Sequence, residues 1–421
     1  MPEIEAAHSA VPAEDTLPAP FTAFDAAALD RIEAAADRVL AETGLRFEDD
    51  PETLALWRQA GAEVDGDRVR LDGPRLRQII RATAPAHFVL HGRNPARSTM
   101  VGAGERPVFA PVYGPPNVLR EDGSGGFGTR ADYHRLMAMA HAAPGLTNTG
   151  HMLCVIGDVP DAARPLEMAI AHLTLSDKPF MGTIASPAAM RQVIDAATAA
   201  IGPLDGKPAG CHLLHLINAT PPLSYKGNPL KCLRLAAESR QGCLVTSYMM
   251  MGATGPVTVA GALIQGYAEV LAGLALAQLW CPGTPVIMGI FAMPFSMSRM
   301  VPVFGDPALH LVQYGAMALA RRLGIPGRGD GGVTSSRLDD AQAGSDGGRA
   351  TAAAMACGAD FILHAAGWLD SGRCTGIAKF RREAEALSLA TGAALPGTEP
   401  PMPLDPALAA DLRRQADLAA G

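Results

Sequence analysis

A set of aromatic and charged side chains recurs where apolar segments in the second part of the chain come to an end. These side chains are Tyr113, Tyr248, Phe291, Phe295, Arg328, Asp330, His364 and Trp368. The chain is poor in aromatic residues, with only 12 Phe, 6 Tyr and 3 Trp, so their concentration at segment ends is informative. Aromatic ring faces attract cations by roughly 0.5–2 kcal/mol per ring. The set suits a quaternary or tertiary ammonium group, with Asp330 as a balancing acid.

Each of these residues also has a structural explanation. Phe291 and Tyr248 could simply fill the interior of the fold, and both interpretations stay open. Trp368 directly follows Ala366 and Gly367, which favours a position at the rim of a pocket. For His151, at the end of another apolar segment, we expect a histidine whose polar atoms are satisfied in the core.

The run Gly327-Arg328-Gly329-Asp330-Gly331-Gly332 is the most unusual segment. Its backbone N–H groups could cradle an anion. Alternatively, it is a turn at which larger side chains would block a pocket. Its spacing matches no Walker motif, which argues against a nucleotide.

Potential metal ligands lack usable spacing. His151 and Cys154, like His212 and His215, are separated by an odd number of residues, so on a strand they point to opposite faces. The chain contains no CxxC pair. The sequence therefore predicts no metal site.

Apolar segments alternate with helical patterns every 30 to 40 residues from about residue 106 onward. The strands are expected at 108–112, 146–153, 180–184, 212–217, 244–250, 286–291, 324–331 and 361–365, and the helices at 131–142, 161–176, 186–201, 228–240, 257–280, 306–323, 339–357 and 375–390. Eight such units predict an α/β fold, a closed (β/α)8 TIM barrel. A doubly wound sheet would need a phosphate loop after the first strand, where Tyr113-Gly114-Pro115-Pro116 stands instead.

We expect four parts along the chain. Residues 1–21 are Pro/Ala-rich and predict a flexible arm, and 22–105 predict an α+β subdomain. Its expected elements are helices at 24–43, 51–61 and 74–83, a hairpin at 64–71 and a strand at 87–90. The barrel spans 106–390. Residues 391–421 predict a loosely attached C-terminal tail with one helix that begins after Asp405.

The net charge and the cysteines limit which binding partners and which cellular compartment we expect. The net charge is −7 and no Lys/Arg run occurs, which argues against nucleic acid or a membrane surface as partner. Seven scattered cysteines, mostly in apolar runs, indicate a reducing, cytoplasmic location. The apolar stretch 257–280 is long enough to span a membrane, but it contains Glu269, Gln265 and Gln278. We interpret it as a buried barrel helix. We also expect a homo-oligomer.

Six separated motifs, in order, resemble those of the trimethylamine methyltransferase superfamily over about residues 25 to 385. They are 90–95 (LHGRNP), 109–116 (FAPVYGPP), 177–180 (DKPF), 255–258 (GPVT), 334–336 with 340–343 (TSS and DAQA) and 364–369 (HAAGWL). The resemblance implies a TIM barrel that passes a methyl group from an amine to the cobalt of a separate corrinoid protein. It implies no tightly bound cofactor in this chain.

Archaeal trimethylamine enzymes of this family carry pyrrolysine in a region that matches residues 330–334. Glycines stand there in this chain, so it resembles the non-pyrrolysine branch, which demethylates glycine betaine and similar quaternary amines. Gly331 and Gly332 would then leave room for a carboxymethyl arm and turn their N–H groups toward its carboxylate. Arg328 is the expected bidentate partner of that carboxylate.

Two alternatives remain open. The family usually continues into a His-rich C-terminal segment that this sequence lacks, and it usually has an aromatic residue and an acid where Gly344-Ser345-Asp346-Gly347 stand here. One alternative is therefore direct methyl transfer to tetrahydrofolate without a corrinoid protein. The other is a barrel that binds a betaine without catalysis.

Overall fold

The structure, a computed structural model, describes residues 19–392 and 399–420. Seven of the eight predicted barrel strands are present: β6 (Val108–Phe109), β9 (Phe180–Gly182), β11 (Leu213–Asn218), β13 (Gly242–Met251), β14 (Val286–Ser296), β16 (Arg328–Asp330) and β17 (Phe361–Leu363). Strands β9, β11, β13 and β14 form one parallel series, and β16, β17 and β6 form another. The two series meet where the Met288 N–H donates to the Pro326 carbonyl at 3.0 Å.

The prediction of a strand at 146–153 is wrong, yet this segment closes the ring. The Asn148 N–H donates to the Phe109 carbonyl at 3.1 Å, and the Met181 N–H donates to the Gly150 carbonyl at 2.7 Å. The Asn148 side chain also accepts from the Gly150 N–H at 2.8 Å. Polar side chains that bind nearby backbone groups compete with ladder pairing, so the segment stays irregular.

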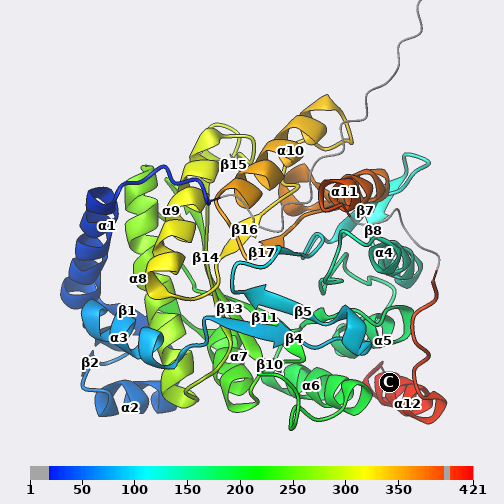
Figure 1. Cartoon of the computed structure of the whole chain (residues 1–421), viewed down its shortest axis with the longest axis horizontal. Coiled ribbons are helices and arrows are strands. Elements are labelled where there is room, and N and C mark those ends of the chain that lie inside the picture. Colours follow the sequence, from blue (N-terminus) through cyan, green and yellow to red (C-terminus); the bar gives the residue numbers. More distant parts are fainter. Residues whose placement is uncertain (1–18, 393–398, 421) are drawn as a thin grey trace, which may run out of the picture.

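Eight helices surround the strands, as expected (Figure 1). They are α4 (Arg130–Ala142), α5 (Arg164–Leu175), α6 (Pro187–Ile201), α7 (Gly227–Glu238), α8 (Val259–Trp280), α9 (Pro307–Leu323), α10 (Ala341–Ala356) and α11 (Ile377–Ala390). By length and composition α8 could cross a membrane, but 72% of its most apolar window is buried within the protein. Its Glu269 is buried and accepts a hydrogen bond from Ser247 of β13 at 2.5 Å. The interpretation of 257–280 as a buried barrel helix is confirmed.

The N-terminal region contains the elements expected of it. Helix α1 (Ala26–Arg38), capped by Asp25, continues into a π-helical turn, η1 (Val39–Thr43). It is followed by β1 (Leu45–Phe47), α2 (Pro51–Gln59), the hairpin β2 (Glu63–Asp65) and β3 (Arg68–Arg70), α3 (Gly73–Thr83), β4 (His87–Leu90), η2 (Pro95–Arg97) and β5 (Thr99–Gly102). Helices α1 and α3 pack on α8, at the flank of the barrel in Figure 1.

The hairpin of β4 and β5 closes one end of the barrel. Phe88 and Val101 of this hairpin pack into one apolar cluster with the inward-facing Leu214, Leu244 and Ile287. Strand β10 (Gly210–Cys211), just before β11, pairs with β4. The hairpin crosses the barrel strands in Figure 1. The plugged end is therefore the one at which the barrel strands begin, and side chains at their carboxyl ends surround the opposite mouth.

Short strands and a 3-10 turn lie around that mouth. They are β7 (Asn117–Leu119), β8 (Gly125–Phe127), β12 (Ser224–Tyr225), β15 (Val301–Pro302), β18 (Trp368–Leu369), the 3-10 turn η3 (Asp370–Gly372) and β19 (Cys374–Gly376). Strands β18, β19, β7 and β8 form one sheet, so the loop after β17 is tied to the loop after β6.

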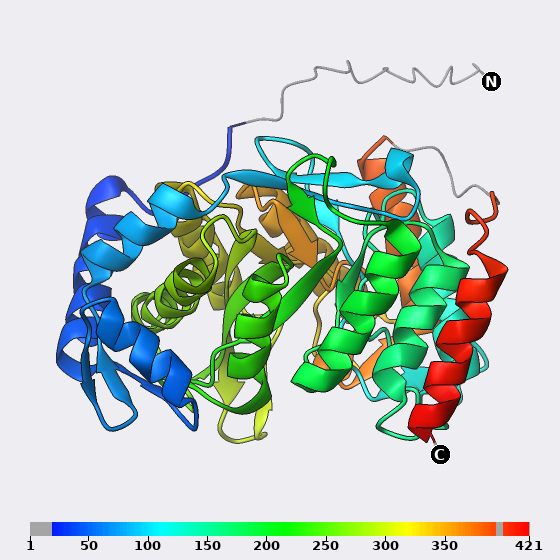
Figure 2. The ribbon, with the colours of Figure 1, turned by 90° about the horizontal axis from the view of Figure 1, so that it is seen from below.

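The expectation of a loosely attached C-terminal tail is wrong for residues 399–420. Helix α12 (Pro406–Ala420) packs on α5 and α6, as Figure 2 shows for the last helix of the chain. Leu412 and Ala416 are buried in this contact. Arg413 forms an ion pair with the buried Glu167 of α5 at 2.9 Å. The arm expected over residues 1–21 falls outside the described residues except for 19–21.

Candidate active site at the mouth of the barrel

A buried ion pair lies inside the barrel above the apolar plug. The Arg328 guanidinium donates to Asp330, two residues later on β16, and to Thr246 Oγ1 of β13 at 3.3 Å. A side chain at Gly289 of β14 would come within 3.1 Å of the Arg328 side chain. The lack of a side chain at Gly289 therefore leaves room for the Arg328 side chain in the barrel interior.

Burial sets the protonation of this pair. It raises the pKa of Asp330 to about 6, against the opposing effect of the Arg328 charge. Burial also lowers the pKa of Arg328, which Asp330 opposes. Asp330 is therefore ionised at neutral pH, and Gln313 fixes its backbone by accepting from the Asp330 N–H at 2.7 Å.

His364 faces the ion pair as a neutral imidazole. Burial and the nearby Arg328 charge hold its pKa well below 6.5. The Tyr113 N–H donates to His364 Nδ1 at 3.2 Å, so the ring proton lies on Nε2. That nitrogen is 3.8 Å from an Asp330 carboxylate oxygen. The residue has a φ of 61°, a strained conformation that recurs at functional sites.

Aromatic rings cover the ion pair on the mouth side. Phe291 lies at the centre, with its ring centroid 5.7 Å from that of Tyr248, 5.8 Å from His364 and 6.4 Å from Trp368. The Arg328 guanidinium carbon is 5.0 Å from the Phe291 centroid. Phe291 and Trp368 are almost fully buried, whereas Tyr248 is 39% exposed. The cluster therefore opens to solvent beside Tyr248.

The structure brings together most of the predicted residues, but not all. Tyr113 contacts the cluster through its backbone, and its ring lies beside His151, at 5.9 Å between centroids. Phe295 extends beyond the barrel, where β14 pairs with β15. His151 is buried, but its Nδ1 has no partner among the described residues, so the expectation of a satisfied histidine is wrong.

Sequence reasoning missed Phe304, a fully buried ring that stacks edge-on against Trp368 at 5.1 Å. It lies in the loop between β15 and α9, away from any strand end. A search restricted to strand ends could not find it. Its only signal is the apolar pair Val303-Phe304 directly before the Gly305-Asp306-Pro307 helix start.

The expected role of Gly331 and Gly332 as N–H donors to a ligand is wrong. The Gly331 N–H donates to the Leu363 carbonyl at 2.9 Å, and the Gly332 N–H donates to Thr351 Oγ1 at 3.0 Å. A Cβ at Gly332 would lie 2.4 Å from the His364 carbonyl oxygen. These glycines are required because the chain after β16 packs directly against the chain after β17.

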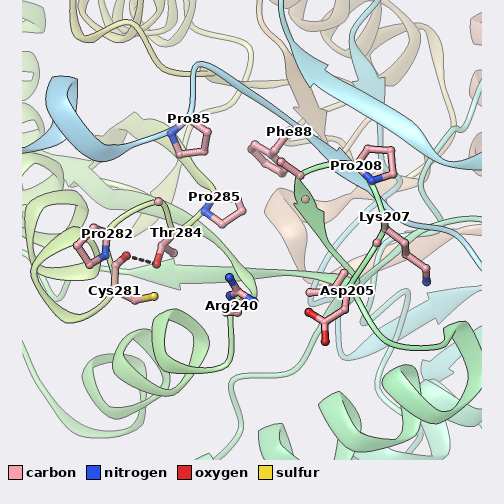
Figure 3. A pocket seen from close by; sticks show the side chains of 15 residues that line it. Pro85, Phe88, Asp205, Lys207, Pro208, Arg240, Cys281, Pro282, Thr284 and Pro285 are labelled. Carbon is pink, nitrogen blue, oxygen red and sulfur yellow. Dashed lines mark hydrogen bonds between the residues drawn. The ribbon is translucent and has the colours of Figure 1, made fainter.

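Cavities lie at both ends of the barrel. At the mouth, an open cavity of about 600 Å³ is lined by residues at and beyond the ends of β14 and β16, including Ser296, Arg299, Ser335 and Gln342. At the plugged end, about 390 Å³ lies among Phe88, Lys207, Arg240 and Thr284 (Figure 3). There the Lys207 ammonium already donates to the Ile201 carbonyl at 2.8 Å. Barrel enzymes work at the carboxyl ends of their strands, so we place the site at the mouth.

Within residues 19–392 and 399–420, no three His, Cys, Asp or Glu side chains are arranged so that they could hold a metal ion. The candidate site therefore consists of an ion pair, a neutral histidine and an aromatic cover. Such a site can orient a small charged molecule, and it offers rings to a cation.

Comparisons with known proteins identify relatives of this chain. The family model of trimethylamine methyltransferase matches residues 3–405. A glycine betaine methyltransferase of Desulfitobacterium hafniense is 36% identical over 79% of this chain and 69% of its own length. A proline betaine:corrinoid methyltransferase of Eubacterium limosum is 29% identical over 79% of this chain and 70% of its own length.

A solved structure shows the same fold. The monomethylamine methyltransferase of Methanosarcina barkeri superposes with a TM-score of 0.52 over 95% of this chain and 79% of that chain, at 10% sequence identity. The family match over nearly the whole chain, the 36% identical relative and the shared barrel lead to one conclusion. The chain belongs to the trimethylamine methyltransferase family.

Proposed function

We propose that the protein demethylates glycine betaine or a similar small betaine and passes the methyl group to the cobalt of a corrinoid protein. The observation that carries this proposal is the aromatic cluster next to a buried Arg328–Asp330 pair. Relatives named as glycine betaine and proline betaine methyltransferases support the substrate class.

The charges of the site match a zwitterion. The carboxylate of a betaine would bind Arg328, and its quaternary ammonium would face Asp330 and the rings around Phe291. Both buried charges would then stay compensated. A simple ammonium ion would pair with Asp330 and leave the Arg328 charge uncompensated in the interior, which is costly. We therefore expect a betaine to be preferred over trimethylamine.

The chain's own residues have little bond chemistry to perform. In a displacement at the methyl carbon the C–N bond breaks, and its electron pair stays on the nitrogen, which leaves as a neutral tertiary amine. No proton is needed, which agrees with a neutral His364. Binding the cation equally in ground and transition state would not raise kcat. The contribution of the barrel is to hold one methyl group toward the open mouth.

The surface around the mouth suits a protein acceptor. Exposed apolar side chains lie near or beyond the ends of the strands there: Tyr248, Val257, Met297, Met300 and Leu338 are 39 to 75% exposed. Clusters of exposed apolar side chains mark interaction sites. A reduced corrinoid on such a partner would supply a nucleophilic cobalt to accept the methyl group. The second candidate, direct transfer to tetrahydrofolate, would instead use the mouth cavity of about 600 Å³, whose volume falls in the size range of small-molecule sites.

A demethylation assay separates these possibilities. The purified protein is incubated with glycine betaine, proline betaine, carnitine, choline or trimethylamine, with a Co(I) corrinoid protein, with tetrahydrofolate, or with neither. We expect a betaine to be demethylated only when the corrinoid protein is present. Transfer to tetrahydrofolate alone would establish the second candidate. Binding of betaine without turnover under every condition would indicate a barrel without catalysis.

Trp368→Leu tests the aromatic cover. The Trp368 ring lies 4.4 Å from His364 and 5.1 Å from Phe304, and its loss removes one cation-binding face. A cation–π contribution of about 1–2 kcal/mol predicts a rise of about 5- to 30-fold in Kd for a quaternary amine, measured by calorimetry. Trp280→Leu, at the far end of α8, is the matched control and should leave Kd unchanged. Equal affinities of wild type and Trp368→Leu for every active substrate would refute the assignment.

A further inference from the structure

A second buried ion pair lies behind the mouth, on α11. Lys379 and Glu383 are one helical turn apart and hydrogen bonded to each other. The Lys379 side chain is fully buried, and 11% of the Glu383 side chain is exposed. Burial lowers the pKa of Lys379 and raises that of Glu383, and each partner's charge opposes the shift. The proposed methyl transfer uses neither residue.

Each member of the pair also binds one of the two loops that form the site. The Lys379 ammonium donates to the Gly332 carbonyl oxygen at 2.8 Å, two residues after Asp330. Glu383 Oε2 accepts from the Gly367 N–H at 2.9 Å, directly before Trp368. We propose that Lys379 and Glu383 are positioning residues that set the distance between the Asp330 loop and the Trp368 loop. The inference rests on the proposed function of that site.

Two neighbouring glycines leave the space that this part of α11 occupies. A Cβ at Gly347 of α10 would lie 2.7 Å from Glu383 Oε1, and one at Gly367 would lie 2.8 Å from the Phe380 ring. Gly367 also has a φ of 95°. The Trp368 indole N–H donates to the Thr334 carbonyl at 3.2 Å, so a shift of either loop moves the ring.

A merely stabilising pair would behave differently. Buried ion pairs contribute little net stability, because desolvation offsets their attraction, and apolar replacements of similar volume are often tolerated. Lys379→Met with Glu383→Leu should therefore fold but release both loops. The matched control is Arg77→Met with Asp37→Leu, which removes a largely buried ion pair (2.7 Å) between α3 and α1 at the flank of the barrel.

The experiment uses two readouts that need no substrate. With Trp57→Phe and Trp280→Phe in the background, Trp368 is the only tryptophan and its emission reports its burial. Hydrogen exchange of 331–337 and 365–372 reports the order of the loops. We expect the α11 double variant to shift the emission to the red, to exchange these segments at least tenfold faster and to raise Kd for glycine betaine at least tenfold. The control double variant should do none of these.

Each outcome decides the proposal. Unchanged emission and exchange in the α11 double variant would overturn it, as would equal changes in the control. If the α11 double variant does not fold, Glu383→Gln and Glu383→Leu are compared. The amide oxygen of Gln can still accept from the Gly367 N–H, so it should preserve the emission and Leu should not; equal behaviour overturns the proposal. If the loop readouts behave as expected while wild type neither binds nor demethylates any betaine, only the proposed function fails.

Discussion

Arg328→Ala is expected to remove betaine binding while leaving binding of choline largely intact. A bidentate bond between a guanidinium and a carboxylate contributes about 3 kcal/mol, so Kd for glycine betaine should rise about 100-fold. Choline has no carboxylate and loses nothing comparable. The variant should still fold, because Asp330 can take up a proton when no cation is bound and can release it when the ammonium of choline binds beside it. The pKa of Asp330 is already raised to about 6 by burial, and loss of the Arg328 charge raises it further.

Calorimetry with the two ligands tests this directly, with Arg299→Ala as the matched control. Arg299 lines the mouth cavity and is exposed, so its guanidinium stays in water. Its removal should change Kd for either ligand by less than about threefold, as is usual for exposed charges. If Arg328→Ala binds glycine betaine as tightly as wild type, or if Arg299→Ala loses it, the carboxylate binds elsewhere.

Much of the fold could be predicted because local patterns determine it. The helices begin within three residues of their expected positions. Most of them have a capping side chain or a proline at their start, as Asp306 and Pro307 show for α9. The weak strand expected at 324–331 was found as β16, shortened to three residues. The strand expected at 146–153 is absent. The apolar pattern of the sequence does not show that the Asn148 side chain binds the neighbouring backbone, which keeps this segment out of regular strand pairing.

The candidate site was predicted less completely, since contacts across the barrel leave no local trace. Strand ends identified Phe291, His364 and Trp368 because parallel strands bring their carboxyl ends together. The same rule included Phe295, which the length of β14 carries past the mouth, and omitted Phe304, which a loop folds back over Trp368. The pairing of Arg328 with Asp330 depends on how their side chains turn within the barrel.

Gly332→Ala is expected to lower both the stability of the protein and its activity, because the added methyl group meets the backbone of the site. Gly332 has a φ of 54°, which costs a residue with a side chain about 1–2 kcal/mol. Its Cβ would also lie 2.4 Å from the His364 carbonyl oxygen and 3.2 Å from the Ala365 carbonyl carbon. Both are backbone atoms at the end of a barrel strand, so they cannot rotate away. The loop must shift, and His364 with it.

Gly324→Ala separates the two contributions to this effect. Gly324 ends α9 with a φ of 75°, and a Cβ there would meet nothing within 4 Å. It should therefore lose about 1–2 kcal/mol of unfolding free energy through φ alone and keep its kcat/KM. Gly332→Ala should lose about 3 kcal/mol or more and lower kcat/KM at least 100-fold, because the clash displaces His364 from Asp330. Denaturant unfolding and steady-state kinetics measure both. Equal losses of stability in the two variants, with kcat/KM preserved, would contradict this prediction. They would show that the chain after β16 can move without an effect on the site, and that Gly332 is needed only for its positive φ.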